Sequence, residues 1–387
     1  MEKIVIIGAN EFQKPLIRKA VELGFETHVF AWRDGAVGAE DADYFYPVSI
    51  VEKDRILEIC REIKPHAVVT IGSDLAMITV QYVASRLGLP CNTSRSIMTA
   101  TNKYRRRQAF LEAGLPTPRF VLVDSHTPLD TISMKFPVIV KPTDRSGSRG
   151  ITKLYHREGL EEAVKAAVEH SFEGKAVVEE FLEGEEYSFE CISYEGVHYD
   201  LAMTKKFTTG EPHYIETGHL EPSGLPAQIY ERAKSQVFQA LDALEITMGA
   251  SHAECKVDQE GQIHMIEVGP RMGGDCIGSD LVHISTGYDF VKMVIWAALG
   301  RRPELVRDRE PAAAAVRFLF SEQDLRHLED LKRETPEKLV SVSGIVMGNP
   351  SGIVDSSTRF GHYILECGSL EEAGELADLQ EENNGTI

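Results

Sequence analysis

The chain has 387 residues, 43% of them hydrophobic and 26% charged, which is typical of two or three globular domains and not of a disordered chain. Its 60 acidic and 41 basic residues give a formal net charge of −19, which would repel phosphate backbones and anionic membranes. We therefore expect small molecules as partners, and neither a nucleic acid nor a membrane. An anionic small molecule still fits, because a local basic site with a divalent cation can work within an acidic surface.

Residues 1–95 have the pattern of a small α/β domain with a doubly wound parallel sheet. Strand-like apolar runs occupy 3–9, 25–32 and 66–72, and helical patterns occupy 15–24 and 77–88. The first turn, GANEFQKP, lacks the GxGxxG glycines of a dinucleotide-binding fold, so NAD is not expected. No secretory signal, long apolar span or CxxC pair occurs, which predicts a cytoplasmic protein with reduced cysteines.

Residues 96–305 form a second predicted unit, in which short strands alternate with longer helices. Its first helix begins at a capping Thr101 and ends at Gly114, and it carries arginines at 105–107, at least two of which we expect on a solvated face. After a charged linker, residues 311–387 alternate strand-like pieces with Gly/Pro turns and are predicted to be a separate small α+β unit. This last unit is a candidate cap over the site or a homodimer interface, and the sequence leaves that choice open.

The segment HAECKVDQEGQIHMIEVGPRMGG, at 252–274, predicts a hairpin closed at DQEG. Pairing Val257 with Gln262 sets Glu254 opposite Met265 and puts Glu267 diagonally along the same face. The opposite, apolar face would then carry the remaining hydrophobic residues Ala253, Cys255, Val257, Ile266 and Val268. Two carboxylates about 7 Å apart repel each other unless a cation lies between them.

A divalent cation between Glu254 and Glu267 would remove that repulsion. Hard oxygen ligands favour Mg²⁺, with Mn²⁺ as the alternative, and the cation would share phosphate oxygens of a substrate. A solvent-facing sheet on which two acids meet by chance is the competing interpretation of the hairpin alone.

Two further stretches are typical of a nucleotide site. Lys141 ends a buried-type strand and precedes RSGSRG (145–150), whose glycines would let backbone amides approach phosphate oxygens, although this is not a Walker A loop. EEFLEGEE (179–186) combines apolar residues, free backbone groups and acids, which suits a hinge that holds a purine and a sugar. A plain flexible hairpin and an exposed acidic turn would explain the same residues.

Four motifs in order resemble the ATP-grasp superfamily of carboxylate-amine ligases over about residues 1–300: TNKYRRRQAFLEAGLPTP, FPVIVKPTDRSGSRG, VVEEFLEGEEYS and the hairpin segment. The ending IEVGPRMGGD and the extra C-terminal unit are most similar to the dipeptide-forming L-amino acid ligases. The resemblance implies an ATP-grasp domain over 96–305 with a lid subdomain at about 116–182, between the N-terminal α/β domain and the C-terminal α+β domain. It also implies that ATP converts a carboxylate, expected to be an amino acid's, into an acyl phosphate, which an amine attacks with release of ADP and phosphate.

The resemblance implies a role for each matched residue. The ATP phosphates would be held by Lys103, Lys141, Ser146, Gly147, Ser148 and Gly150, and the adenosine by Glu179, Glu180, Phe181, Leu182 and Glu186. Mg²⁺ would be held by Glu254 and Glu267, and catalysis would depend on Arg271 and on Lys206, with Lys205 as the alternative to Lys206. Gly269 departs from the family, which has an asparagine there as a further metal ligand, so the number of metal ions stays open.

The acceptor side is less defined. His213, Glu216 and His219, in HYIETGHLEPSG, are candidates for substrate contacts because they follow the phosphate-side segment, and a plain surface loop is an equal alternative. Two other functions are kept: a purine-pathway or biotin-carboxylase-like enzyme that uses bicarbonate or a ribonucleotide, and an ATP-binding protein without catalysis.

Overall fold

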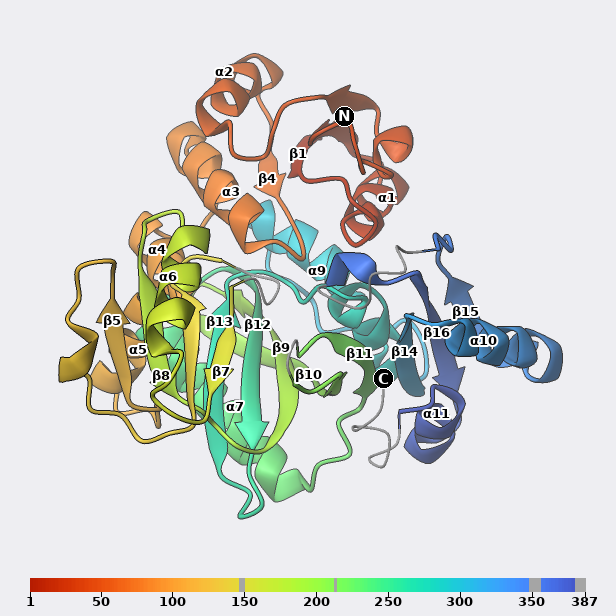
Figure 1. Ribbon diagram of the computed structural model, residues 1–387. Coiled ribbons are helices and arrows are strands. Elements are labelled where there is room, and N and C mark those ends of the chain that lie inside the picture. Colours follow the sequence, from red (N-terminus) through yellow and green to blue (C-terminus); the bar gives the residue numbers. More distant parts are fainter. Residues whose placement is uncertain (146–149, 212–213, 348–355, 380–387) are drawn as a thin grey trace.

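The computed structural model describes residues 1–145, 150–211, 214–347 and 356–379, which contain three β-sheets with helices packed on them (Figure 1). Within this part of the chain, no helix is both long and apolar enough to cross a membrane.

The N-terminal sheet is parallel and has the order β3-β2-β1-β4. Its elements are β1 (Lys3–Ile7), α1 (Lys14–Glu22), β2 (Glu26–Phe30), β3 (Tyr44–Tyr46), α2 (Lys53–Ile63), β4 (Ala67–Val69) and α3 (Asp74–Leu87). Apolar side chains of α2 and α3 cover one face, and those of α1 and of a later helix, α9, cover the other. The expected doubly wound α/β fold is therefore confirmed, and α9 joins this sheet to the middle of the molecule.

The second sheet is antiparallel, has the order β5-β8-β6-β7 and lies at the left of Figure 1. Its elements, with the two helices before them, are α4 (Ser94–Thr101), α5 (Lys103–Glu112), β5 (Phe120–Val123), β6 (Val138–Pro142), β7 (Thr152–Leu154), α6 (Leu160–His170) and β8 (Ala176–Glu180). Thr101 does not cap the predicted helix, because it ends α4. Asn102 is the cap of α5, and its side-chain oxygen accepts the Arg105 backbone N–H at 3.1 Å.

The third sheet has eight antiparallel strands in the order β13-β12-β9-β10-β11-β14-β16-β15. Its strands are β9 (Glu185–Tyr194), β10 (Val197–Thr208), β11 (Glu216–Glu221), β12 (Gly249–Val257), β13 (Ile263–Gly269), β14 (Ala313–Leu319), β15 (Leu339–Val342) and β16 (Gly361–Cys367). Its helices are α7 (Ala227–Ala243), a π-helical turn (Ile277–Leu281), α8 (Val282–Thr286), α9 (Phe290–Ala298), α10 (Glu322–Glu334) and α11 (Leu370–Leu376). The C-terminal strands do not form a sheet of their own, because β14 pairs with β11 and so extends the central sheet.

The predicted register of the β12–β13 hairpin is wrong. Val257 pairs with Ile263, so five residues form the turn, and Glu254 lies directly opposite Glu267. A β-bulge follows, because Cys255 pairs with Met265 and leaves Ile266 as the extra residue. Met265 and Val268 both reach the core, whereas Ile266, which was predicted on the apolar core face, lines a cavity beside Glu267.

Glu221, at the end of β11, is a buried acid outside that cavity's lining. It has no exposed surface, and its carboxylate accepts hydrogen bonds from the hydroxyls of Thr204 and Ser285. Burial raises the pKa of Glu221 to about 7, although the two hydroxyls act in the opposite direction. A carboxyl whose folded-state pKa is raised stabilises the fold below its unfolded pKa, and this stability is lost as the pH rises through about 7.

We therefore expect Glu221→Gln to stabilise the protein at pH 8, by at most about 3 kcal/mol, and to have little effect at pH 5. Urea unfolding at both pH values measures the difference, with the exposed Glu195→Gln as the control. An equal change in the free energy of unfolding at pH 5 and pH 8 would show that Glu221 is already ionised at pH 5 in the folded protein.

Candidate active site

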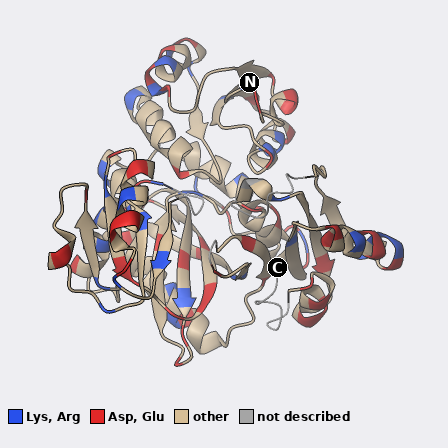
Figure 2. Ribbon diagram, in the orientation of Figure 1, with Lys and Arg blue, Asp and Glu red and all other residues tan. Residues whose placement is uncertain are grey.

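A cavity of about 380 Å³ lies where the three sheets meet, and Figure 2 shows both signs of charge on the strands around it. Its lining comes from the loop that leads into α3, from α5, from the second sheet and from the third, central sheet, with Ser356 from the C-terminal section. The second sheet lies in the predicted lid subdomain and is called the lid sheet below. It brings together many of the residues predicted from the sequence: Lys103, Lys141, Glu179, Glu180, Phe181, Leu182, Glu186, Lys206, Glu216, His219, Glu254, Glu267 and Arg271. Gly150 is outside this lining, and Ser146, Gly147, Ser148 and His213 lie outside the described residues.

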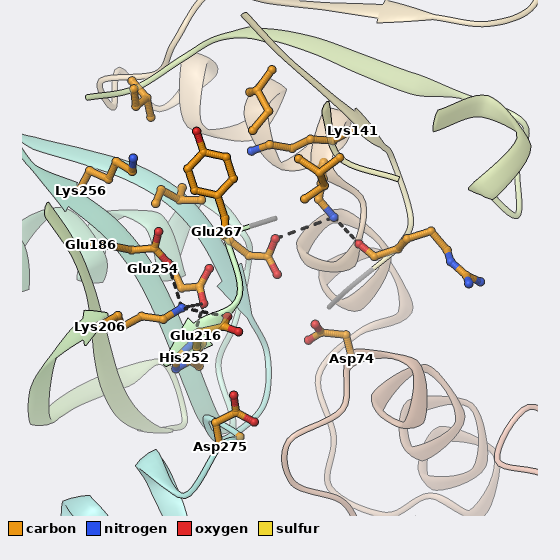
Figure 3. Close-up of a pocket in the computed structure, with 18 of the residues that line it drawn as sticks. Asp74, Lys141, Glu186, Lys206, Glu216, His252, Glu254, Lys256, Glu267 and Asp275 are labelled. Carbon is orange, nitrogen blue, oxygen red and sulfur yellow. Dashed lines mark hydrogen bonds and ion pairs between the residues drawn. The ribbon is translucent and has the colours of Figure 1, made fainter. Parts of the chain in front are cut away.

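The two predicted metal acids face the same space from neighbouring strands (Figure 3). Lys206 Nζ lies 2.6 Å from Glu254 Oε1, and Arg106 lies 3.1 Å from Glu267 Oε2. Burial alone would raise the pKa values of both acids, but these cations lower them, for Glu254 to well below its ordinary value. Both groups are thus carboxylates, which are hard oxygen donors of the kind that Mg²⁺ prefers.

The donor set fits a cation that shares its ligands with a substrate. Among the described residues, no three His, Cys, Asp or Glu side chains converge as a metal cage, so two carboxylates would leave the remaining positions to phosphate oxygens and water. Gly269 adds no oxygen. Without a bound metal ion, Lys206 and Arg106 compensate the charges of the two carboxylates.

His252 was not assigned a role from the sequence, although it lies two residues before Glu254. Its Nδ1 contacts the fully buried carboxylate of Glu190, and its Nε2 lies 3.2 Å from Glu254 Oε1. Burial would lower the pKa of His252, but the two carboxylates raise it to about 9. Glu190 also accepts the Gly273 N–H at 3.0 Å, so this imidazolium fixes the orientation of Glu254 against a rigid backbone.

Arg106 and Arg107 are buried, which corrects the expectation of a solvated basic face on α5; Arg105 alone of the three is exposed. Arg107 binds both carboxylate oxygens of Glu179, at 2.9 and 3.2 Å. The inner face of α5 can be basic because the carboxylates of β8 and β13 lie against it. The signal in the sequence was the run of three arginines at 105–107. On a helix, two neighbours of such a run, here Arg106 and Arg107, can lie on the inner face.

Glu179 does not present its carboxylate to a purine, since Arg107 holds it and Lys141 Nζ lies 3.4 Å away. Burial would raise the pKa of Glu179, and these two cations lower it. Glu179 therefore positions Lys141. The backbone after β8 remains available, because the Leu182 N–H has no hydrogen-bond partner among the described residues, whereas those of Glu180 and Phe181 are used within the lid sheet.

Lys206, and not Lys205, faces the cavity. Successive residues of β10 point to opposite faces, so Lys205 pairs with Glu185 at 2.8 Å on the other side. Lys206 Nζ lies 3.0 Å from Glu186 and 3.9 Å from Glu216, in addition to its contact with Glu254. Burial would lower the pKa of Lys206, but the three carboxylates raise it well above its ordinary value, so this lysine stays charged.

Lys103 begins α5 and points its ammonium at the Arg145 carbonyl, 3.9 Å from Glu267. Burial lowers the pKa of Lys103, and Glu267 only partly compensates. Together with Lys141 and Lys206, it forms a set of cations around the space beside Glu254 and Glu267.

A second group of charges lies beside Lys206. Two of its residues, Glu216 and His219, were predicted from the sequence, and the other two, Asp275 and Arg359, were missed. Arg359, from the C-terminal section, lies 3.1 Å from Glu216 and 2.8 Å from Asp275. His219 is buried beside them, and neither of its ring nitrogens has a hydrogen-bond partner within the described chain. Burial, followed by the charge of Lys206, lowers the pKa of His219 to about 3, so its imidazole is neutral.

A sequence model of the ATP-grasp domain family matches residues 134–280. This segment is an ATP-grasp domain. The matched segment contains strands β6, β7 and β8 and both Glu254 and Glu267, and the resemblance noted in the sequence is confirmed.

Relatives of this chain include amino acid ligases. It is 31% identical over 201 residues to a D-alanine–D-alanine ligase of Hydrogenovibrio crunogenus, an alignment that spans 49% of this chain and 62% of that enzyme. The chain thus covers less than two thirds of that relative. It is 24% identical over 380 residues to an alanine–anticapsin ligase of Bacillus subtilis, which spans 88% of this chain and 77% of the relative.

Solved structures show the same fold over the whole chain. An L-amino acid ligase from Bacillus licheniformis superposes with a TM-score of 0.81 at 23% identity, covering 98% of this chain and 97% of that one. Phosphoribosylglycinamide synthetase from Anaerococcus prevotii gives a TM-score of 0.77 at 20% identity, covering 99% and 98%. At such identities these matches establish the fold of the chain alone, and the substrate must be argued from the site.

Proposed function

We propose that this chain is an ADP-forming ligase that joins the carboxylate of one amino acid to an amine, with Mg²⁺ as its metal. The observation that carries the proposal is that one cavity has two ends, which meet at Lys206. One end gathers Lys103, Lys141 and Lys206 around the paired Glu254 and Glu267. The other end has acids paired with Arg359, beside His219, whose ring has no hydrogen-bond partner among the described residues.

The first end suits a nucleoside triphosphate. Phosphoryl transfer is catalysed mainly by positioning and by neutralising charge on phosphate oxygens, which lysines and a bound Mg²⁺ supply. The hinge offers the Leu182 N–H to a base, and Glu186 lies beside Lys206 where a sugar would follow. Transfer of the γ-phosphoryl group to a carboxylate oxygen gives an acyl phosphate and ADP.

The second end suits a zwitterion. An amino acid brings a carboxylate and an ammonium. This end has Glu216 and Asp275 for the ammonium, and Arg359, which is bound to both acids, lies next to them for the carboxylate. Arg271 also lines the cavity, and its planar guanidinium can stabilise the oxyanion that forms when an amine attacks the acyl phosphate. The attack forms the C–N bond as the amine gives up a proton, and collapse of the intermediate breaks the C–O bond to phosphate and releases it.

Bicarbonate or a ribonucleotide fits the second end less well. Fold likeness to phosphoribosylglycinamide synthetase is compatible with such a substrate, but it concerns the fold alone. A ribonucleotide phosphate would have to enter beside Glu216 and Asp275, and bicarbonate has no cationic group to pair with these acids. A pair of carboxylates near the reacting position favours a cationic amine.

The proposal is tested by measuring ADP and phosphate release with ATP and Mg²⁺ across all pairs of a panel of amino acids, with bicarbonate in separate reactions. We expect equal amounts of ADP and phosphate, and a product of the joined mass, for at least one pair. ADP release that depends on bicarbonate would favour the alternative enzyme. Tight ATP binding without turnover for any pair would favour a non-catalytic ATP-binding protein.

A further inference from the structure

Gly269, where the ATP-grasp resemblance predicts an asparagine, lies against two side chains of the cavity. A Cβ atom built at this position would lie 2.8 Å from Asp74 Oδ1 and 3.1 Å from both Cζ and Nε of Arg271. Gly269 has no left-handed backbone angle, so any other residue would be excluded by these contacts and not by backbone strain.

Neither neighbour is a free end that can swing away. Arg271 Nε donates to Asp74 Oδ1 at 3.0 Å, and its Nη2 donates to Oδ2 at 3.3 Å. This two-point contact fixes the plane of the guanidinium, as paired hydrogen bonds between arginine and a carboxylate do. Both side chains are mostly buried, at 13% and 15% exposure.

The backbone around Asp74 is also held. Asp74 is the first residue of α3, whose cap Ser73 accepts the Ala76 N–H at 3.2 Å. The loop before it touches the segment after β13, because the Gly72 N–H donates to the Met272 carbonyl at 3.2 Å. The N-terminal domain therefore brings the carboxylate of Asp74 into the cavity, where it faces Glu267 (Figure 3).

We propose that Asp74 is a positioning residue, which occupies the space left by the glycine at 269 and holds Arg271 toward the reacting carboxyl. A side chain at 269 and the Asp74–Arg271 pair exclude each other. At this place the chain has no asparagine on β13 and has instead a carboxylate from the N-terminal domain. We call this replacement the exchange. The role in catalysis rests on the proposed ligase function, whereas the steric exchange does not.

The test compares Gly269→Ala, Asp74→Ala and the double variant. We expect each single variant to lower kcat by at least 10-fold, with the Kd for a non-hydrolysable ATP analogue, measured calorimetrically, changed less than 2-fold. In the double variant the added methyl group has room, so Gly269→Ala should cost less than 2-fold in kcat on the Asp74→Ala background. Asp74→Glu should recover part of the activity and Asp74→Asn little, because the contact to Arg271 needs a carboxylate.

Gly344→Ala is the control glycine, because a Cβ there meets nothing within 4 Å, and it should leave kcat unchanged. An equal cost of Gly269→Ala with and without Asp74, or full kcat in Asp74→Ala, overturns the proposal. The same cycle in urea unfolding separates it from the ligase proposal. If no substrate pair reacts, a destabilisation by Gly269→Ala that disappears on the Asp74→Ala background still supports the exchange, and additive destabilisation rejects it.

Discussion

Glu267→Gln is expected to lower the rate of ADP release by about 10² to 10³-fold, which is the usual loss when one charged contact to a transition state is removed. The amide keeps the size of the side chain but removes one of the two negative charges that lie opposite each other across the hairpin. A divalent cation and the triphosphate that it accompanies would then lose one of two anionic protein ligands. The rate is measured at saturating ATP with a Mg²⁺ titration.

The control for this variant is Glu260→Gln, in the exposed turn of the same hairpin. Because Arg106 also loses a partner in Glu267→Gln, a melting curve of each variant must accompany the kinetics. If Glu267→Gln keeps full activity and an unchanged Mg²⁺ dependence, the assignment of the metal to the Glu254–Glu267 pair is wrong.

Lys206→Met is expected to have two effects, a loss of activity of 100-fold or more and a loss of about 3 to 5 kcal/mol of stability. Its ammonium compensates Glu254 at 2.6 Å and Glu186 at 3.0 Å, and removing it leaves buried carboxylates without their main partner. Urea unfolding measures the second effect independently of substrate.

Lys205→Met is the matched control, one residue earlier on the same strand and facing the other side. Its pair with Glu185 is near the surface, where such pairs contribute about 0 to 1 kcal/mol. Similar losses of activity and stability in the two variants would show that facing the cavity gives Lys206 no role that Lys205 lacks.

Most of the fold and much of the cavity could be predicted from the sequence, because both depend on local patterns. Alternating strand and helix patterns predicted the N-terminal parallel sheet, and four motifs in order predicted that the lysines and acids share one site. Helix α10 was missed, since its residues are mostly charged and only Leu328 and Leu331 are buried. Its signal was present in the capping box of Ser321 and Asp324.

The remaining errors concern contacts that no local pattern specifies. The hairpin register depends on the bulge at Ile266, which forms so that Met265 and Val268 both reach the core beneath α7. Arg359 enters the site only because β14 pairs with β11, and Asp74 only because the N-terminal domain docks on the segment after β13. These are pairings between distant segments, and single-sequence periodicity carries no information about them.

The continuity of the central sheet into β14 has a consequence for how the protein can be divided. A chain shortened before residue 311 would leave β11 as an open edge, with unpaired backbone groups that can recruit another molecule. It would also uncover Phe207 and Leu220, whose apolar partners lie on β14, β16 and α11. The C-terminal section is therefore unsuited to deletion or to exchange between relatives as a module, and its boundary is better treated as the interior of one folding unit.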